Sequence, residues 1–325
     1  MSSTPSALAA NLRVTYADLL RTLSLLEAGE VECASLETEW TPKALLAHVA
    51  FWDRTQTQRL QDVLAGVTAD SGFARPASTN DVRAQADATR SLDAILVEVE
   101  QARADLISLT EALTPAQLET PYREGDSWLT PSRLIAHMAN HTRQHERELW
   151  RYCGSMRRWT RAGLRVFLAR QDANLMDSIG GLSEAALIAP GVIDNWSIRD
   201  VLVHILAWRE YGYRVAKQWP RVDKVSLAPW LEGATKDAIN AQLLAARAAL
   251  NMIDIADGLT TYHRRMLKLL DQASDAQLAS IGDPGQGEPG ELSGFVYGLT
   301  LHEMEHAEEI WRFRVEQDGD KTIGD

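Results

Sequence analysis

The chain has 325 residues, and 33 lysines and arginines against 45 aspartates and glutamates give it a formal net charge of −12. The length predicts two domains of ordinary size, and an apolar fraction of 45% with a charged fraction of 24% is typical of a globular protein. The acidic balance argues against nucleic acids and anionic membranes as partners, because proteins that bind them carry a basic face.

The N-terminal stretch lacks the basic start and apolar run of a signal peptide. No segment approaches the ~18 consecutive apolar residues of a membrane-spanning helix. The two cysteines, Cys33 and Cys153, form no Cys-x-x-Cys motif and fit a reducing compartment. We therefore expect a cytoplasmic protein.

Helical periodicity continues along the chain, beginning with Leu19, Leu20, Leu23 and Leu26. Thr41-Pro42 and Thr130-Pro131 are typical of a helix N-cap followed by proline at the first helical position, and Ser197 is a matching cap. No run of alternating β-branched residues predicts a strand. The expected helices are residues 6–28, 41–65, 79–112, 130–152, 161–180, 197–218, 235–272 and 292–316.

Segments of the first half recur in the same order in the second half. WTPKALLAHVAFW at 40–52 corresponds to WSIRDVLVHILAW at 196–208, and HTRQHERELWR at 141–151 corresponds to HEMEHAEEIWR at 302–312. A weaker pair, LTPAQL and ASDAQL, lies between them, and the offset between the copies changes only from 156 to 161 residues. Such a collinear pattern indicates an internal duplication.

Four helices in each copy indicate a helical bundle with a site in its core. We therefore predict an all-α fold made of two tandem four-helix bundles. The expected domains are residues 1–155 and 160–325.

Seven of the eight histidines lie in or beside the repeated motifs. In each copy one histidine lies on the second helix and a His-x-x-x-His pair lies on the fourth, where residues four apart share one face. Three such imidazoles can share one metal ion and leave a coordination position open, as in catalytic zinc sites. The predicted ligands are His48, His141 and His145 in the first copy and His204, His302 and His306 in the second.

His137 lies one turn before His141, but its counterpart in the second copy is Gly298. We therefore expect His137 to line the pocket or to pack in the core. The repeated tryptophans are expected to pack around the bundle cores.

Zinc is the expected ion, and nickel, iron and manganese also suit the donor set. Bound there, a divalent ion could lower the pKa of a water molecule or bind a thiol as thiolate. Asp200, one turn before His204, either orients that imidazole or serves as the negative charge favoured at a helix N-terminus. Further candidates for a base or anchor are Asp53, Asn140, Arg143, Glu146, Tyr297, Glu303 and Glu305.

These motifs resemble the DinB/YfiT-like superfamily of four-helix metalloproteins, whose pattern is a histidine on the second helix and His-x-x-x-His on the fourth. HMANHTRQHE at 137–146 is similar to the fourth-helix signature, with Glu146-Arg147-Glu148 in place of the usual Arg-Gly-Gln. PGVIDNWSIRDVLVHILAW at 190–208 resembles the ClbS/DfsB branch, which is associated with self-protection against genotoxic metabolites and need not use a metal.

The resemblance implies several activities, because relatives include transferases and isomerases that use a low-molecular-weight thiol and metal-dependent hydrolases. Relatives are often homodimers, so the two copies are expected to pack on each other as a pseudo-dimer, with further oligomerisation left open.

Two functions follow as hypotheses. The first is a metal-dependent transferase or hydrolase that acts on a small electrophilic or thiol-linked molecule, in which the first copy, with its richer histidine cluster, is favoured as the active one. The alternative is a non-catalytic self-protection module that sequesters a reactive small molecule.

Overall fold

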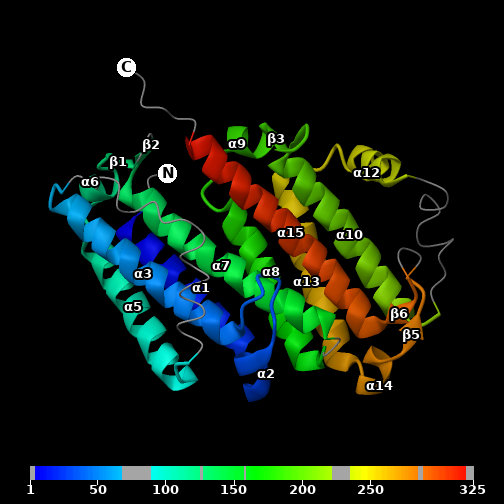
Figure 1. Ribbon diagram of the computed structural model, residues 1–325. Coiled ribbons are helices and arrows are strands. Elements are labelled where there is room, and N and C mark those ends of the chain that lie inside the picture. The colour runs from blue at the N-terminus through cyan, green and yellow to red at the C-terminus, as the bar shows by residue number, and fades with distance from the viewer. Residues whose placement is uncertain are drawn as a thin grey trace. The chain divides into compact units, whose positions relative to one another are not determined.

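The computed structural model describes residues 4–67, 89–124, 127–156, 159–221, 235–284 and 288–319. The chain divides into two compact units, Met1–Met156 and Arg157–Asp325. Each unit is built on four long helices, which confirms the predicted all-α fold of two tandem bundles (Figure 1).

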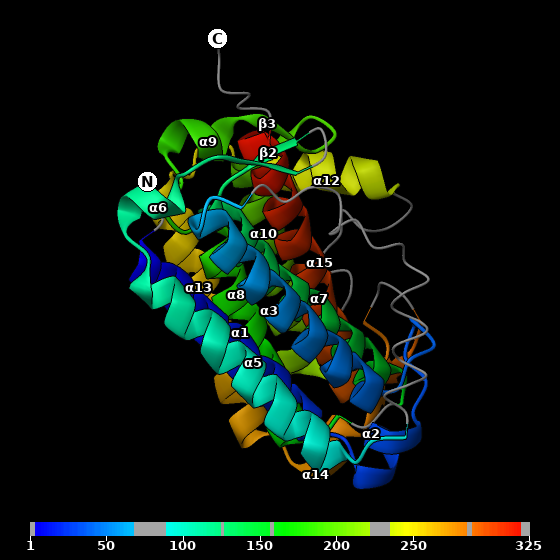
Figure 2. The same ribbon diagram turned by 60° about the vertical axis from the view of Figure 1, so that its left-hand side comes forward.

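The first unit is a bundle in which the first and second long helices share the same two neighbours. Its long helices are α1 (Pro5–Leu23), α3 (Pro42–Leu64), α5 (Leu92–Ala112) and α7 (Pro131–Ser155). α1 packs on α5 and α7, and α3 packs on the same pair, so the four run side by side around one core (Figure 2). Every helix contributes a fully buried residue to this core: Leu12, Leu60, Leu106 and Ile135.

The second unit repeats this arrangement with α8 (Arg161–Ile179), α10 (Ile198–Gln218), α13 (Met252–Gln272) and α15 (Leu292–Gly319). α8 and α10 each pack on both α13 and α15. The matching core residues are Leu175, Ile205, Ile255 and Ile310, all fully buried. A further helix, α12 (Lys236–Ala245), packs on α10.

Hydroxyl caps set the start of the histidine-bearing helices, as the sequence predicts. The side chains of Thr41, Thr130 and Ser197 each accept a hydrogen bond from a backbone N–H in the first turn of α3, α7 and α10. Because the caps occupy equivalent positions, His48 and His204 are each the seventh residue of their helix.

Two predicted helices begin or end differently in the structure. The helix expected over 6–28 ends at Leu23 and is followed by the short α2 (Ala28–Cys33), whose own capping box starts a new helix. In the helix expected over 79–112, α5 starts only at Leu92, and residues 79–88 lie outside the described residues.

The prediction of a single helix over residues 235–272 is wrong. It is two helices, α12 and α13, because Asn251 caps α13 by accepting hydrogen bonds from the backbone N–H groups of Ile253 and Asp254. The other five predicted helices agree with the structure to within three residues at each end.

Short strands, which the sequence did not predict, precede three of the four helices that carry the cluster histidines. Strands of two to four residues are too short to display alternating polarity. Three antiparallel pairs lead into α7, α10 and α15. They are β1 (Tyr122–Glu124) with β2 (Ser127–Leu129), β3 (Pro190–Ile193) with β4 (Trp196–Ser197), and β5 (Ile281–Gly282) with β6 (Gly290–Glu291). Short helices complete the units: α6 (Pro115–Leu118), α9 (Glu184–Ile188) and α14 (Asp275–Leu278).

A buried ion pair ties the helices of the first unit together. The Arg103 guanidinium on α5 donates to both carboxylate oxygens of Asp53 on α3, at 2.7 and 3.2 Å. It also donates to the Thr142 hydroxyl on α7 at 2.6 Å and to the backbone carbonyl of Leu12 on α1 at 3.3 Å. Arg103 and Asp53 are 1% and 0% exposed, so one guanidinium links all four helices in the dry core.

The second unit has the reverse arrangement of charges. Arg209 on α10 occupies the position of Asp53 and donates to both carboxylate oxygens of Glu303 on α15, at 2.9 and 2.7 Å. It also reaches Asp172 on α8 at 2.7 Å and the backbone carbonyl of Leu259 on α13 at 2.9 Å. One arginine therefore links four helices in each unit, but it lies on the third long helix in the first unit and on the second long helix in the second unit.

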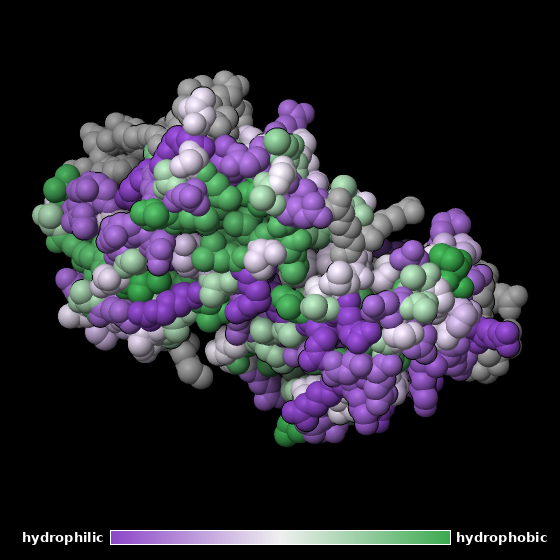
Figure 3. All heavy atoms as spheres, turned by 90° about the horizontal axis from the view of Figure 1, so that it is seen from below, coloured by the Kyte–Doolittle hydropathy of each residue, from purple (hydrophilic) through white to green (hydrophobic). Residues whose placement is uncertain are grey.

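Hydrophobic residues also reach the surface, and Figure 3 shows a face on which they gather within a hydrophilic margin. Large apolar side chains that are 38–73% exposed occur in both units: Val14, Leu25, Val67, Val97, Met156, Ile188, Ile253 and Ile281. None of the helices among the described residues is long and apolar enough to span a lipid bilayer.

The substitution Asp53→Ala should lower the free energy of unfolding of the first unit by about 3–5 kcal/mol, because it leaves Arg103 as an uncompensated buried charge. Scanning calorimetry measures this as a lower transition temperature for that unit. Glu111→Ala is the matched control, since its ion pair with Arg13 is about half exposed and is worth less than ~1 kcal/mol. Equal losses in the two variants would contradict the role of the buried pair.

Candidate metal centres

Three imidazoles meet in the core of the first unit. The Nε2 atom of His141 on α7 lies 3.1 Å from Nε2 of His48 on α3 and 3.1 Å from Nε2 of His145, one turn along α7. The three nitrogens lie within 4.8 Å of one another. Two separate helices thus bring the predicted residues to one point.

The second unit repeats this cluster almost atom for atom. Nε2 of His302 on α15 lies 3.1 Å from Nε2 of His204 on α10 and 3.0 Å from Nε2 of His306. His302, like His141, is the eleventh residue of its helix. The duplication therefore preserves the geometry as well as the residues.

The donor set fits a divalent metal ion. Three Nε2 atoms that face a common point offer three lone pairs to one ion, which is the ligand number of catalytic zinc sites. Nitrogens bound to a tetrahedral zinc ion at about 2.0–2.1 Å lie about 3.4 Å apart, close to the separations in both clusters.

Four of the cluster imidazoles, those of His48, His141, His204 and His302, are neutral at physiological pH. Burial, and after it the proximity of the other cluster histidines, lowers the pKa of His48 and of His302 to about 3 and that of His204 to about 2. The same causes lower the pKa of His141 well below its ordinary value. Because a histidine must be deprotonated to bind a metal, these side chains have no proton to displace.

A carboxylate contacts the outer nitrogen of the last histidine in each cluster. Nδ1 of His145 lies 3.1 Å from Oε1 of Glu148, and Nδ1 of His306 lies 2.7 Å from Oε2 of Glu309. Such a partner holds the proton on Nδ1 and directs the lone pair of Nε2 to the centre of the cluster.

The sequence analysis missed these two glutamates, although the signal was present. The fourth-helix motif repeats as His-x-x-x-His-x-x-Glu in both copies. A side chain three residues after a histidine lies on the same helix face, so the repeated glutamate could have been assigned.

The proposed orienting role of Asp200 is wrong, and its alternative role at the helix N-terminus is correct. Its Oδ2 accepts hydrogen bonds from the backbone N–H of Ser197 at 2.9 Å and from its hydroxyl at 2.6 Å, which caps α10. Nδ1 of His204 is buried with no hydrogen-bond partner among the residues that the structure describes.

The other candidate bases and anchors have different partners. Asp53 and Glu303 belong to the buried ion pairs. Glu146 accepts hydrogen bonds from Thr22 and Trp150, and Arg143 donates to Asn140. The Tyr297 ring stacks on Trp159 with centroids 4.3 Å apart, and Glu305 is exposed.

Tryptophans flank the second-helix histidine in both units. The ring centroids of Trp40 and Trp52 lie 4.8 and 6.2 Å from that of His48. Trp196 and Trp208 lie 5.2 and 6.1 Å from His204 in the same way. His137 stacks on His141, with centroids 6.3 Å apart and planes 22° from parallel. The repeated indoles therefore shield the clusters as well as the cores.

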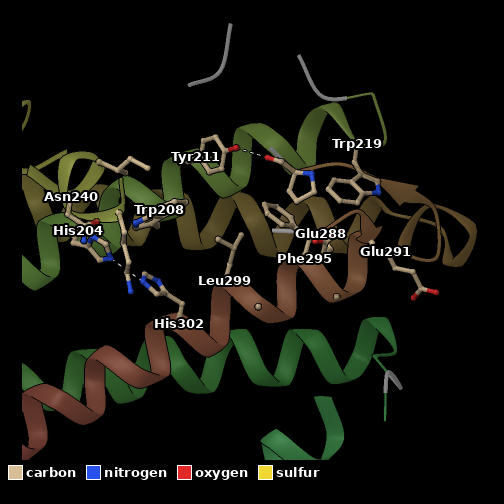
Figure 4. Close-up of a pocket in the computed structure, with 16 residues that line it drawn as sticks. His204, Trp208, Tyr211, Trp219, Asn240, Glu288, Glu291, Phe295, Leu299 and His302 are labelled. Carbon is tan, nitrogen blue, oxygen red and sulfur yellow. Dashed lines mark hydrogen bonds between the residues drawn. The ribbon is translucent and has the colours of Figure 1, made fainter. Parts of the chain in front are cut away.

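A cavity of about 560 Å³ adjoins the second cluster (Figure 4). His204 and His302 line one end of it, between α10 and α15, and α12 contributes Lys236 and Asn240. The rest of the wall includes four aromatic rings, those of Trp208, Tyr211, Trp219 and Phe295. This volume suits a small organic molecule.

The sequence of each unit matches one known family. A family model described as the DinB superfamily matches residues 11–149 and again residues 168–310. Each matched region contains one complete three-histidine cluster. No significant match was found among curated proteins or solved structures.

Replacing Glu148 or Glu309 by glutamine should weaken metal binding at the cluster concerned by about 10–100-fold, because the carboxylate no longer polarises the Nδ1–H group. Competition with a chromophoric chelator measures the affinity. Asp200→Asn is the matched control and should leave the metal affinity unchanged, since Asp200 accepts a hydrogen bond from Ser197 and not from a cluster histidine. An equal loss in the control would contradict this role for the glutamates.

Metal-free protein should lose stability as the pH falls from about 6.5 towards about 3. In that window the unfolded chain protonates histidines whose pKa is 6.5, whereas the folded chain keeps His48, His204 and His302 neutral. Above pH 6.5 both states are neutral and the effect disappears. Urea denaturation at about pH 7.5 and about pH 5 tests this. A variant with asparagine at these three positions should lose less stability, and an equal loss would contradict the explanation.

Proposed function

This chain belongs to the DinB superfamily through both of its halves, and we propose that each half binds one divalent metal ion. The ligands are His48, His141 and His145 in the first unit and His204, His302 and His306 in the second. The observation that carries this proposal is the convergence of three Nε2 atoms in each unit, with neighbouring pairs 3.0–3.1 Å apart. The fit of zinc to three imidazoles makes it the first ion to test.

The chemistry that we propose is that of a metal-dependent transferase or hydrolase. A divalent ion with three protein ligands keeps a position for a water molecule or a thiol and supplies the Lewis acidity that favours loss of its proton. The substrate would be a small electrophilic molecule, or one linked to a low-molecular-weight thiol.

The protein's own residues hold the reacting site in one geometry. Glu148 and Glu309 keep the proton of the last histidine on Nδ1, so that Nε2 remains a ligand. Trp52 and Trp208 limit the access of water to the clusters from the side of the second helix. A low local dielectric strengthens the electrostatic effect of a bound ion on its substrate.

The cavity also favours a second candidate function. Its aromatic wall could retain a reactive small molecule without turnover, as a self-protection module would. The two candidates differ in one measurable respect, because only the enzyme requires metal for multiple turnover.

Protein purified without a metal-affinity step should contain about two ions per chain by atomic emission spectroscopy, one for each cluster. The substitutions His48→Ala and His204→Ala should each reduce the content to about one. His137→Gln is the matched control and should keep both ions, because the second unit has Gly298 at that position.

Activity is then compared between metal-free and zinc-loaded protein, with p-nitrophenyl esters as probes of hydrolysis and chlorodinitrobenzene with cysteine as a probe of thiol transfer. Multiple turnover that needs zinc supports the enzyme. Failure of the protein to bind any ion, even after reconstitution, would overturn the metal proposal and favour sequestration.

A further inference from the structure

A lysine lies at the histidine end of the cavity in the second unit. Lys236 and Asn240, one turn apart on α12, line the cavity together with His204 and His302. Asn240, one turn along α12 from Lys236, lies beside His204 (Figure 4). Lys236 makes no ion pair with any residue in the described ranges. This end of the cavity therefore favours an anionic group.

The middle of the cavity presents aromatic faces whose polar atoms are already bonded. The Trp219 indole N–H donates to the carbonyl of Ser280 at 2.8 Å, and the Tyr211 hydroxyl donates to the carbonyl of Pro284 at 2.6 Å. Trp219 also stacks on Phe295, with ring centroids 5.4 Å apart. With their hydrogen-bonding groups satisfied, these rings offer mainly apolar surface, which suits a flat and apolar ligand.

Two glycines on α15 keep the cavity open. Gly294 and Gly298 line it, and a Cβ atom added at either would meet no atom within 4 Å. Glycine weakens a helix interior relative to alanine, so neither position is explained by helix stability or by close packing. In the first unit the corresponding residues, Arg133 and His137, both carry bulky side chains.

The opposite end of the cavity is acidic. Glu288 and Glu291 line it beside Trp219 and Phe295, away from the histidines (Figure 4). Like charges repel, so an anionic group is disfavoured there. The charges at the two ends therefore specify the direction in which a ligand lies.

We infer that the cavity of the second unit is a substrate-binding site, and that it takes an aromatic carboxylate or a similar planar anion. The anionic group lies beside Lys236 and Asn240, and the ring system lies between Trp219, Tyr211 and Phe295. The inference rests on the proposed function only where it places the anion next to a metal ion.

Isothermal titration with a matched probe series tests the inference. The probes are 4-biphenylcarboxylate, its neutral amide and 4-biphenylmethylammonium, which share one ring system and differ in charge. The carboxylate should bind at least tenfold more tightly than the amide, and the ammonium compound should bind most weakly, because only the carboxylate gains a charge-assisted hydrogen bond.

Two variants test separately the contribution of the Lys236 charge and that of the open volume at Gly298. Lys236→Met should weaken binding of the carboxylate about tenfold and leave the amide unchanged. Gly298→Leu should weaken both probes at least tenfold because its side chain occupies the cavity, while the fold remains intact because the Cβ atom has open space. Lys268→Met is the matched control, since this exposed lysine on α13 does not line the cavity.

Metal content is measured on the same samples, so that the two proposals can fail separately. Carboxylate preference in protein that binds no metal would overturn the proposed function and support the cavity assignment. The protein could instead bind metal but bind the carboxylate and the amide with equal affinity, or the Gly298→Leu variant could bind both probes as tightly as the parent protein. Either result would overturn the cavity assignment alone.

Discussion

The buried ion pair beside each histidine cluster is the interaction on which the position of the imidazoles depends. On α3, Asp53 lies five residues after His48, and Thr142, the hydroxyl partner of Arg103, directly follows His141. A charge removed from water is stable only if its partners keep their geometry. The helices are therefore held against sliding along their axes, and three nitrogens from two helices stay within 3.1 Å of their neighbours.

Much of the fold could be predicted because the chain contains two copies of its pattern. The caps at Thr41, Thr130 and Ser197 are local signals, and they located three helix starts to within one residue. The break between α12 and α13 was missed because helical periodicity continues on both sides of it, although Asn251 has the type and spacing of a cap. The paired strands depend on hydrogen bonds across turns and leave little trace in two to four residues.

The candidate site was predictable where its residues share a helix or a repeat. His141 and His145 follow from helical spacing, and His48 follows from its recurrence as His204. The cavity was not predictable in this way, because Lys236 comes from α12, a helix that the sequence analysis did not separate from α13. The cavity adjoins the second cluster, and Gly298 leaves open space there at the position that His137 occupies in the first copy.

The reversed polarity of the two ion pairs has a consequence for how a duplicated chain folds. Tandem copies of one domain risk exchanging equivalent helices during folding. A hybrid bundle that paired α3 with α15 would bury Asp53 opposite Glu303, and one that paired α10 with α5 would bury Arg209 near Arg103. Either mismatch places like charges in a dry core, at a cost of several kcal/mol against a typical domain stability of about 5–15 kcal/mol. The position of the core arginine and its acidic partner thus differs between the two halves, which favours assembly of each half from its own helices.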